Sequence, residues 1–263
     1  MNEMYLTTHR RSEKIVDLTK IKMHTHEYYE LYCFLMGDVK YLVEGNIYEL
    51  KPGDLLIMKK SEAHSLLINE KVPYERIVVF FNEAAIIGNK DNKLTEFIDN
   101  KPLGKNNKYT SSYLKEFDHL YLLERMCKIK NKQQKSAYLS VIINELSRAK
   151  CLDGNYSDNA VEIIKYINDN ITEKLTLETI CKRFFVSKTH LIRMFKALTG
   201  TTVWDYIVTK RIMKARMLLQ SGERPYDIYL KCGFKDYCSF FKAYKLKFGV
   251  SPKQDFKSKK TLP

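Results

Sequence analysis

Two segments near the C-terminal end decide the fold: LTLETICKRFFVSKTHLIRMFKALTG (Leu175–Gly200) and PYDIYLKCGFKDYCSFFKAYKLKFGVSP (Pro225–Pro252). Each segment predicts a short helix, a tight turn and a second helix that is basic and amphipathic. A predicted helix over Val203–Gln220 joins the two. Because a helix-turn-helix unit places its second helix in the major groove of DNA, the duplicated pattern predicts a DNA-binding domain.

The second helix of the first segment is expected to begin after Ser187, a good N-terminal cap. Its apolar residues recur at spacings of three and four, which leaves the opposite face exposed. Five residues of that face are expected to contact DNA, the first three at bases and the last two at phosphates: Thr189, Ile192, Arg193, Lys188 and Lys196. The guanidinium of Arg193 fits a guanine edge, and Thr189 and Ile192 suit a thymine methyl group.

The second segment has the same organisation, with Asp236 as the expected cap. Its outward residues are expected to contact bases, except for the last, which is expected to contact a phosphate: Tyr237, Cys238, Phe241, Lys242 and Lys245.

The helix between the segments is expected to act as a rigid strut. Its expected apolar stripe is Trp204, Ile207, Ile212, Ala215 and Leu218. A helix of about 16 residues is ~24 Å long. It therefore suits two recognition helices that lie one turn of DNA apart, ~34 Å, on one face of the duplex.

The positive charge of the chain is concentrated in its last third. Residues 171–263 contain 20 Lys and Arg against 7 Asp and Glu, whereas the whole chain has 45 against 31. The other residues are almost neutral, with 25 basic and 24 acidic side chains. Such a distribution indicates a polyanionic partner for the last third. The alternative is a helical bundle with a solvated basic face, which the two spaced helix-turn-helix patterns disfavour.

The composition is that of an ordinary globular protein, with 44% hydrophobic and 29% charged residues, and 263 residues suffice for two domains. No apolar run approaches the ~18 residues of a membrane-spanning helix. The N-terminus has no apolar segment typical of a secretory signal. We therefore expect a cytoplasmic protein without membrane contact. Its six cysteines form no CxxC pair and are expected to be reduced.

The first 85 residues alternate short apolar segments with turn signals, which predicts β-structure. The expected strands are Glu30–Leu35, Lys40–Val43, Asn46–Leu50, Asp54–Met58, His64–Ile68 and Arg76–Phe81. Short strands at this spacing are typical of a small antiparallel barrel or jelly roll. The expected fold class is therefore a two-domain α+β protein, with an N-terminal barrel and a C-terminal helical domain.

Four side chains able to bind a metal occur in this β-rich region: His24, His26, Glu30 and His64. Together with a Pro-Gly-Asp turn, they resemble the two motifs of the cupin barrel, in which the equivalent residues hold one metal ion. Strand alternation predicts that His24 and His26 face a shared interior. Imidazoles with one carboxylate suit Zn, Fe, Mn or Ni. However, a long insert, Leu55–Ala63, separates the turn from His64.

Three interpretations of these four residues remain: a metal site, the polar wall of a small-molecule pocket, and histidines satisfied by their neighbours. The barrel has no further acidic or histidine cluster that would supply a catalytic acid or base, so no enzymatic activity and no cofactor are predicted. We favour the pocket wall, with Tyr41 as a fifth effector-contacting residue. The surrounding aromatic residues either stack on a sugar ring or form core.

Helical periodicity over Tyr113–Lys130 and Gln134–Lys150 predicts two helices packed against the barrel. Their apolar faces either contact a second subunit, which we favour, or are buried within one protomer. The polar segment 151–159 is the expected linker between a domain at 1–150 and a domain at 160–263. Ser157 or Asp158 is expected to cap the helix that follows.

The last hundred residues carry a dense set of characteristic positions: Leu191, Arg193, Phe195-Lys196, Thr199-Gly200, Arg211, Ala215, Leu218-Leu219, Ile228, Gly233-Phe234, Asp236, Phe240, Lys242, Gly249 and Ser251-Pro252. Together they resemble the signature of the AraC/XylS family of transcription regulators. Two residues depart from it. Tyr229 stands where the family has a small residue, and Phe241 stands where small polar residues are usual. The second unit is therefore expected to pack differently or more loosely.

The resemblance implies that the barrel binds an effector, a sugar in many members, and mediates dimerisation. RNA polymerase is a further partner that it suggests. We therefore predict a dimeric, sequence-specific regulator that binds double-stranded DNA and activates a carbohydrate-utilisation operon in response to a sugar. Two alternatives are a metal-dependent cupin enzyme with a DNA-binding appendage, and an effector-independent regulator whose barrel only dimerises.

Overall fold

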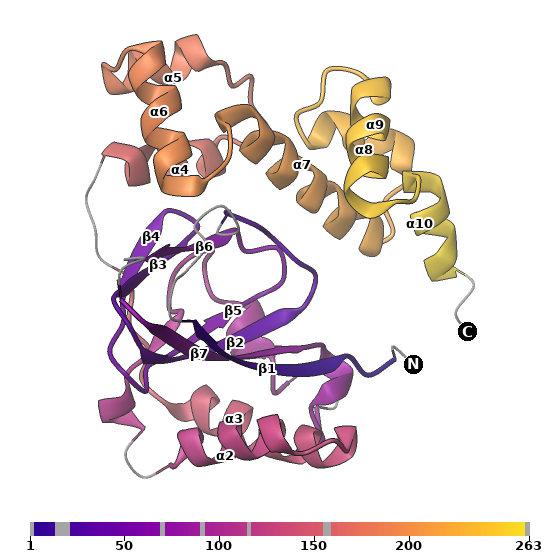
Figure 1. Ribbon diagram of the computed structural model, residues 1–263. Coiled ribbons are helices and arrows are strands. Elements are labelled where there is room, and N and C mark those ends of the chain that lie inside the picture. Colours follow the sequence, from indigo (N-terminus) through magenta and orange to yellow (C-terminus); the bar gives the residue numbers. More distant parts are fainter. Residues whose placement is uncertain are drawn as a thin grey trace. The chain divides into compact units, whose positions relative to one another are not determined.

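The computed structural model describes residues 3–13, 22–68, 72–89, 93–114, 117–154 and 159–260. The chain divides into two compact units, Met1–Tyr156 and Ser157–Pro263, which are described separately (Figure 1). Cys151 packs against the core of the first unit, and Leu152 pairs with Lys108 in an antiparallel bridge. The start of the expected linker therefore belongs to the first unit. The expected caps Ser157 and Asp158 lie outside the described residues.

Two antiparallel sheets form the first unit, with strand orders β1-β7-β2-β5-β8 and β4-β3-β6. Their bounds are β1 Leu6–Glu13, β2 Tyr29–Met36, β3 Val39–Val43, β4 Asn46–Glu49, β5 Leu55–Met58, β6 His64–Ile68, β7 Tyr74–Phe81 and β8 Lys108–Tyr109. The antiparallel β-domain is thus confirmed, and all six expected strands are present to within two residues. β1 was not predicted because seven of its eight side chains are polar, so it has no apolar pattern.

Strand alternation gives the larger sheet two buried faces. On β2, Tyr32 and Phe34 belong to an aromatic-rich cluster shared with the smaller sheet. The intervening Leu31 and Cys33 belong to a second cluster on the opposite face, which includes residues of the helices that follow. This double burial explains why β2 is apolar along nearly its whole length.

Several helices follow the strands: η2 Glu83–Ala85, α1 Glu96–Asp99, η4 Ser111–Tyr113, α2 His119–Lys128 and α3 Lys132–Arg148. α2 and α3 cover the outer face of the larger sheet (Figure 1), packing through Leu123 and Ile142 among others. The expected helix over Tyr113–Lys130 was too long. α2 begins only at His119, because the Asp118 side chain accepts from the Tyr121 backbone N–H and caps it there.

The second unit is helical: α4 Asn159–Asp169, α5 Leu177–Phe184, α6 Lys188–Thr199, α7 Val203–Gln220, α8 Pro225–Lys231, α9 Tyr237–Phe248 and α10 Pro252–Lys260. The two expected helix-turn-helix units are α5–α6 and α8–α9. α10 was not predicted, because the second segment was expected to end at Pro252. Gly249 does end α9, but Pro252 opens a new helix, a position where its missing N–H costs nothing. No helix in the described parts of the chain is long and apolar enough to cross a membrane.

α7 has 18 residues, or ~27 Å, and belongs to the cores of both helix-turn-helix units. Near its start, the Tyr206 ring packs on Phe195 of α6. Near its end, Ala215 and Leu219 belong to the core of the second helix-turn-helix unit. The expected stripe was wrong at Trp204, which is 58% exposed; Val203 and Tyr206 are buried instead.

Arg211, in the middle of α7, and Gly233, between α8 and α9, connect the second helix-turn-helix unit to the loop before the first. The Arg211 guanidinium donates to the carbonyl oxygens of Ile171 and Glu173, between α4 and α5. Gly233, at the turn of the second unit, lies so close that a Cβ there would stand 2.8 Å from the Thr172 oxygen and 2.9 Å from Arg211 Nε. The turn of the second helix-turn-helix unit thus packs on the loop that precedes the first.

Phe185 ends α5 in a strained conformation, with φ 53° and ψ 40°, and its side chain is 96% exposed. A side chain in the left-handed region costs free energy, and this one buries nothing in return. We expect Phe185→Gly to raise the free energy of unfolding by about 0.5–1 kcal/mol, after the larger unfolded-state entropy of glycine is subtracted. Urea denaturation of the full chain measures the change.

The control for this prediction is Gly222→Ala. Gly222 has φ 98° and no atom near the place of a Cβ, so the substitution adds backbone strain alone and should destabilise. Equal unfolding free energies for wild type and Phe185→Gly would show that strain at Phe185 is negligible.

Candidate functional site

Helix α6 is held in place by its two ends and by one buried face. The Ser187 side chain accepts from the His190 backbone N–H, as expected for the cap, and Gly200 ends the helix with φ 68°. Leu191 and Phe195 are fully buried. These contacts fix which residues of α6 face solvent.

The exposed face of α6 carries the five residues expected to contact DNA. Thr189, Ile192, Arg193 and Lys196 line an open hollow of about 440 Å³ together with Ala197. Lys188 is exposed at the start of the helix, 3.8 Å from the Glu178 carboxylate. The sequence analysis did not single out Ala197, which lies one position beyond Lys196 on the same face. A surface with an arginine, a lysine and apolar groups has the chemistry needed to contact phosphates and base edges.

Helix α9 repeats the construction of α6 at an offset of 49 residues. The Asp236 side chain caps it by accepting from the Ser239 backbone N–H, and Gly249 ends it with φ 74°. Phe240 and Tyr244 are fully buried, at the positions of Leu191 and Phe195. Cys238, Lys242 and Lys245 are exposed as expected. Leu246, which the sequence analysis missed, is 90% exposed at the position of Ala197.

Two residues of α9 do not face outward as expected: Tyr237 and Phe241 are half-buried. Tyr237 is partly covered by Tyr229 of α8, whose ring makes an edge-to-face contact with the Tyr237 ring. The Tyr229 ring centroid lies 5.9 Å from that of Tyr237 and 6.0 Å from that of Tyr226. Tyr226, Tyr229 and Tyr237 therefore form an aromatic cluster. Tyr229 and Tyr237 pack against the core of the second helix-turn-helix unit.

The four residues of the first unit that the sequence analysis singled out as able to bind a metal lie together in one cluster. His24 and His64 form an antiparallel backbone pair with hydrogen bonds of 3.0 and 3.1 Å, and their ring centroids are 4.4 Å apart. The His26 ring lies 4.9 Å from that of His64. One ligand atom of each residue lies within 4.8 Å of those of the others, and Glu30 and His64 are buried. The expected long insert does not separate these residues, because β5 and a turn occupy it and return the chain to His64.

The Glu30 carboxylate is the centre of this cluster. Its Oε2 accepts from His26 Nε2 at 2.9 Å and its Oε1 from the Tyr41 hydroxyl at 3.1 Å. His64 Nε2 lies 3.2 Å from Oε2 but makes no hydrogen bond. Tyr41, expected to contact an effector, thus holds the carboxylate in place.

The pKa values of the cluster reflect its burial and its charges. Burial disfavours the Glu30 charge, but His64 and His26 outweigh it and hold the pKa of Glu30 below its ordinary value. Burial also works against a charged His64, yet Glu30 reverses that effect and raises the pKa of His64. Part of His24 is exposed to solvent, but desolvation by the surrounding protein atoms and the neighbouring His64 lower its pKa to about 4, so it is neutral at pH 7.

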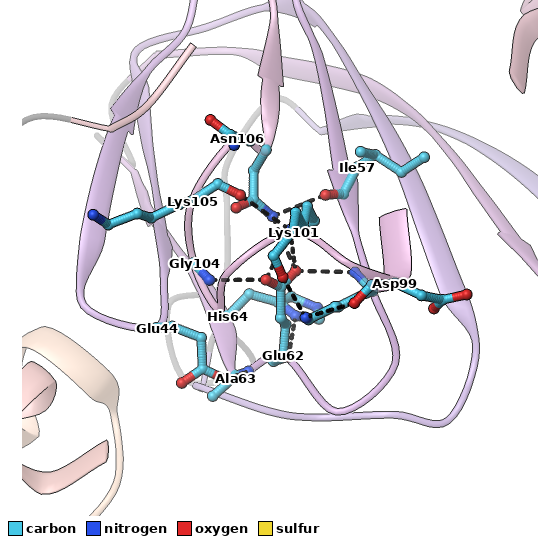
Figure 2. Close-up of polar contacts among 12 residues, drawn as sticks. Glu44, Ile57, Glu62, Ala63, His64, Asp99, Lys101, Gly104, Lys105 and Asn106 are labelled. Atoms are coloured by element: carbon cyan, nitrogen blue, oxygen red, sulfur yellow. Dashed lines mark hydrogen bonds and ion pairs between the residues drawn. The ribbon is translucent and has the colours of Figure 1, made fainter. Parts of the chain in front are cut away.

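A buried ion pair beside the cluster positions His64. Figure 2 shows the Glu62 carboxylate at the centre of a polar network that fastens the 99–107 loop to the sheets. Lys101 Nζ donates to both carboxylate oxygens at 2.8 and 2.9 Å, and the Gly104 backbone N–H donates at 2.8 Å. The Glu62 carbonyl oxygen in turn accepts from His64 Nδ1 at 2.8 Å. Sequence reasoning missed this network because Lys101 is far from Glu62 along the chain.

Both units match models of known protein families. Residues 180–258 match the model of a helix-turn-helix domain, and residues 9–92 match that of an AraC-like ligand binding domain. The regulatory protein SoxS of Escherichia coli K12 is 30% identical over 92 residues, which cover 35% of this chain and 86% of SoxS. The chain belongs to the AraC family of transcriptional regulators.

Other AraC-family proteins match along nearly the whole chain. The transcriptional activator RhaS of Mannheimia succiniciproducens is 23% identical over 240 residues, or 88% of this chain and 87% of RhaS. The structure of ToxT from Vibrio cholerae covers 96% of this chain and 98% of its own, with 16% identity and a TM-score of 0.41. The two family models identify this AraC-family chain as a DNA-binding transcriptional regulator with a ligand-binding domain. The resemblance to the AraC/XylS family that was found from the sequence is confirmed.

Proposed function

We propose that the protein is a cytoplasmic, dimeric activator of a carbohydrate-utilisation operon, controlled by a sugar that binds in the first unit. The observation that carries the DNA-reading part is the exposed face of α6, where Arg193 and Lys196 stand beside Thr189 and Ile192 on one open hollow. Activation is supported by the relative RhaS, which is named as a transcriptional activator. RNA polymerase is the partner that an activator requires.

The residues of α6 and α9 have distinct proposed roles. Thr189, Ile192 and Arg193 read bases from the first unit, and Cys238 and Lys242 read bases from the second. Exposed lysines, Lys188, Lys196 and Lys245, bind phosphates. Tyr237 and Phe241 are half-buried, so their contribution is limited to the edge of each ring.

The α7 strut sets the spacing of the two DNA segments that one chain reads. With α7 holding the two recognition helices in one body, one chain reads two successive segments of the major groove, about one DNA turn or 10–10.5 base pairs apart. A dimer doubles this arrangement. The exposed Tyr121 and Val141 on α2 and α3 are the apolar residues that this helix pair offers to a second subunit.

Selection of duplexes from random DNA by the purified full chain tests the proposal. We expect enrichment of two short motifs separated by about one helical turn. The selected duplex is then titrated with and without each of a panel of sugars. A sugar that binds must change DNA affinity or the preferred spacing, since an effector acts only through unequal affinity for two arrangements. If no motif is enriched, the proposed sequence-specific DNA reading is wrong. If no bound sugar changes DNA binding, the proposed control by a sugar is wrong.

The observed interior also favours a second candidate, a regulator whose barrel only dimerises. Tyr32, Phe34, Tyr41 and Tyr48 are each at most 3% exposed and pack on one another between the two sheets. The aromatic residues expected to stack on a sugar are thus part of the core. Unchanged DNA binding with every sugar, together with a dimer that the first unit maintains, would support this candidate.

Lys196→Ala provides a check of the phosphate contact. Loss of one phosphate-bound cation should weaken binding to the selected duplex and to random DNA alike. It should also reduce the slope of log K against log salt by ~1. Titrations at several salt concentrations measure both. Ala197, its exposed neighbour on the same hollow, supplies the control as Ala197→Ser, for which the slope should stay that of the wild type. A slope unchanged in Lys196→Ala would remove Lys196 from the set of phosphate contacts.

A further inference from the structure

Arg76 of β7 is a cation on the face of the larger sheet that packs against the smaller sheet. In the pairing of β2 with β7 its partner is Phe34, and paired residues of antiparallel strands project from the same face. Phe34 belongs to the aromatic-rich cluster between the two sheets. So do Tyr74 and Val78, which lie two positions before and after Arg76 on β7. The Arg76 side chain therefore lies in the space between the sheets, beside the aromatic core.

The charge of Arg76 is not balanced by a carboxylate. The side chain is half-buried, and none of the residues that the structure describes forms an ion pair with it. Its Nη1 donates to the Tyr74 hydroxyl at 2.8 Å, and its buried Nε has no hydrogen-bond partner among these residues. Burial raises the pKa of Tyr74 and of Tyr32, so neither hydroxyl ionises at pH 7 to neutralise the guanidinium. A half-buried cation without a counter-charge is costly, and an anion beside it would remove that cost.

The acidic side chains near Arg76 are held by other residues. The Glu30 carboxylate of the barrel cluster accepts from His26 at 2.9 Å. Glu75 precedes Arg76 on β7 and therefore projects from the opposite face, where it pairs with Arg10 at 2.8 Å. Neither carboxylate is thus available to balance the charge of Arg76.

A second arginine lies directly across from Arg76 on the edge strand β1. Arg11 and Arg76 are partners in the register of β1 and β7, so both side chains project from the same face of the sheet. Like charges in directly opposite positions repel each other, although water screens part of this repulsion at the exposed Arg11. The acidic neighbour of Arg11 on this strand, Glu13, is 4.0 Å from it. An anion bound at Arg76 would therefore also be attracted by Arg11.

We propose that Arg76, with Arg11 beside it, binds the anionic group of the effector, which is a carboxylate or a phosphate. A guanidinium presents parallel N–H donors that match two oxygens of either group. Arg76 is only half-buried, so solvent reaches part of its side chain. The inference rests on the proposed function, because it names the chemical class of the same effector. That effector is a sugar acid or a sugar phosphate rather than a neutral sugar.

Calorimetric titration of the full chain with matched sugars tests the proposal. Glucose, glucuronate and glucose 6-phosphate differ only at carbon 6, which carries a hydroxyl, a carboxylate oxygen pair or a phosphate ester. Galactose and mannose supply the same three forms. We expect an anionic form of one sugar to bind, and its neutral form to bind at least about tenfold more weakly. Whether the uronate or the phosphate binds more tightly distinguishes the two sources of the anion.

Variants of Arg76 locate the bound anion. Arg76→Met should weaken binding of the anionic sugar at least about tenfold, and Arg76→Lys, which keeps the charge but not the parallel donors, should weaken it less. Arg76→Met removes an unbalanced charge and leaves the 2.7 Å hydrogen bond between the Tyr32 and Tyr74 hydroxyls. Urea denaturation without ligand should therefore show that it is at least as stable as the wild type. Arg10→Met is the matched control, since Arg10 is on the opposite face of the same sheet and its loss should not change the affinity.

Three results would overturn the inference. They are the absence of binding by every anionic form, equal binding of the neutral sugar, and binding that Arg76→Met leaves unchanged, which would place the anion on the basic second unit. Titration of the selected duplex with the same sugars separates this inference from the proposed function. A neutral sugar that changes DNA binding would refute only the anionic class. An anion that binds at Arg76 without changing DNA binding would support the site and refute control by that effector.

Discussion

Replacing Lys101 by methionine is expected to lower the free energy of unfolding by about 3–5 kcal/mol, because it leaves a buried carboxylate without its cation. The Lys101 and Glu62 side chains are 3% and 0% exposed, and Lys101 contacts both carboxylate oxygens. Methionine preserves the length of the side chain but donates nothing. Urea denaturation followed by far-UV circular dichroism measures the loss. Fluorescence of Trp204, the single tryptophan, reports on the second unit separately.

Two further variants show whether the unpaired charge is the cause. Lys101→Met combined with Glu62→Gln removes the charge as well and should recover most of the loss. Lys40→Met removes the lysine of an exposed pair, whose side chains are 42% and 73% accessible, and should cost less than about 1 kcal/mol. A Lys101→Met variant no less stable than Lys40→Met would contradict the assignment.

Replacing Arg193 by alanine is expected to weaken binding to the selected duplex by about 1–3 kcal/mol and to relax discrimination at one base pair. Arg193 lies on the exposed hollow of α6, and the guanidinium presents two parallel donors to a guanine edge. A loss of this size is roughly 5- to 150-fold in affinity. Titration of the selected duplex and of four duplexes that differ at the affected position measures both effects.

Arg193→Lys is the sharper variant, since it preserves the charge and removes the two-pronged geometry. We expect it to bind random DNA like the wild type while losing much of the discrimination. An equal loss on selected and random DNA in Arg193→Ala would instead make Arg193 a phosphate contact, as proposed for Lys196.

Features with a short-range signal were predicted well. The caps Ser187 and Asp236 and the bounds of α7 followed from capping residues and helical spacing, which act within a few residues. β1 and Trp204 show where the same reasoning fails. A polar edge strand has no apolar period, and a tryptophan at helical spacing is exposed when no neighbouring element covers it.

The helix faces proposed to contact DNA were predictable in part for the same reason. The exposed face of α6 follows from the buried Leu191 and Phe195 on the opposite face. On α9 the same rule placed Tyr237 outward, but the rings of Tyr226 and Tyr229 from α8 partly cover it. That cover depends on which helices meet in space, so a periodicity along one helix does not contain it.

The sequence by itself determined the family, the duplicated helix-turn-helix, the basic last third and the four residues of the barrel cluster. Only the tertiary structure decided how the side chains of that cluster are oriented. The sequence analysis favoured a pocket wall, since spacing says which residues are near one another and nothing about their ring nitrogens. The orientation of His64 depends on a carbonyl held by Lys101, which lies 39 residues beyond Glu62. Hydrogen bonds between distant segments set the direction of a side chain, and direction decides which of its atoms a histidine presents to its neighbours.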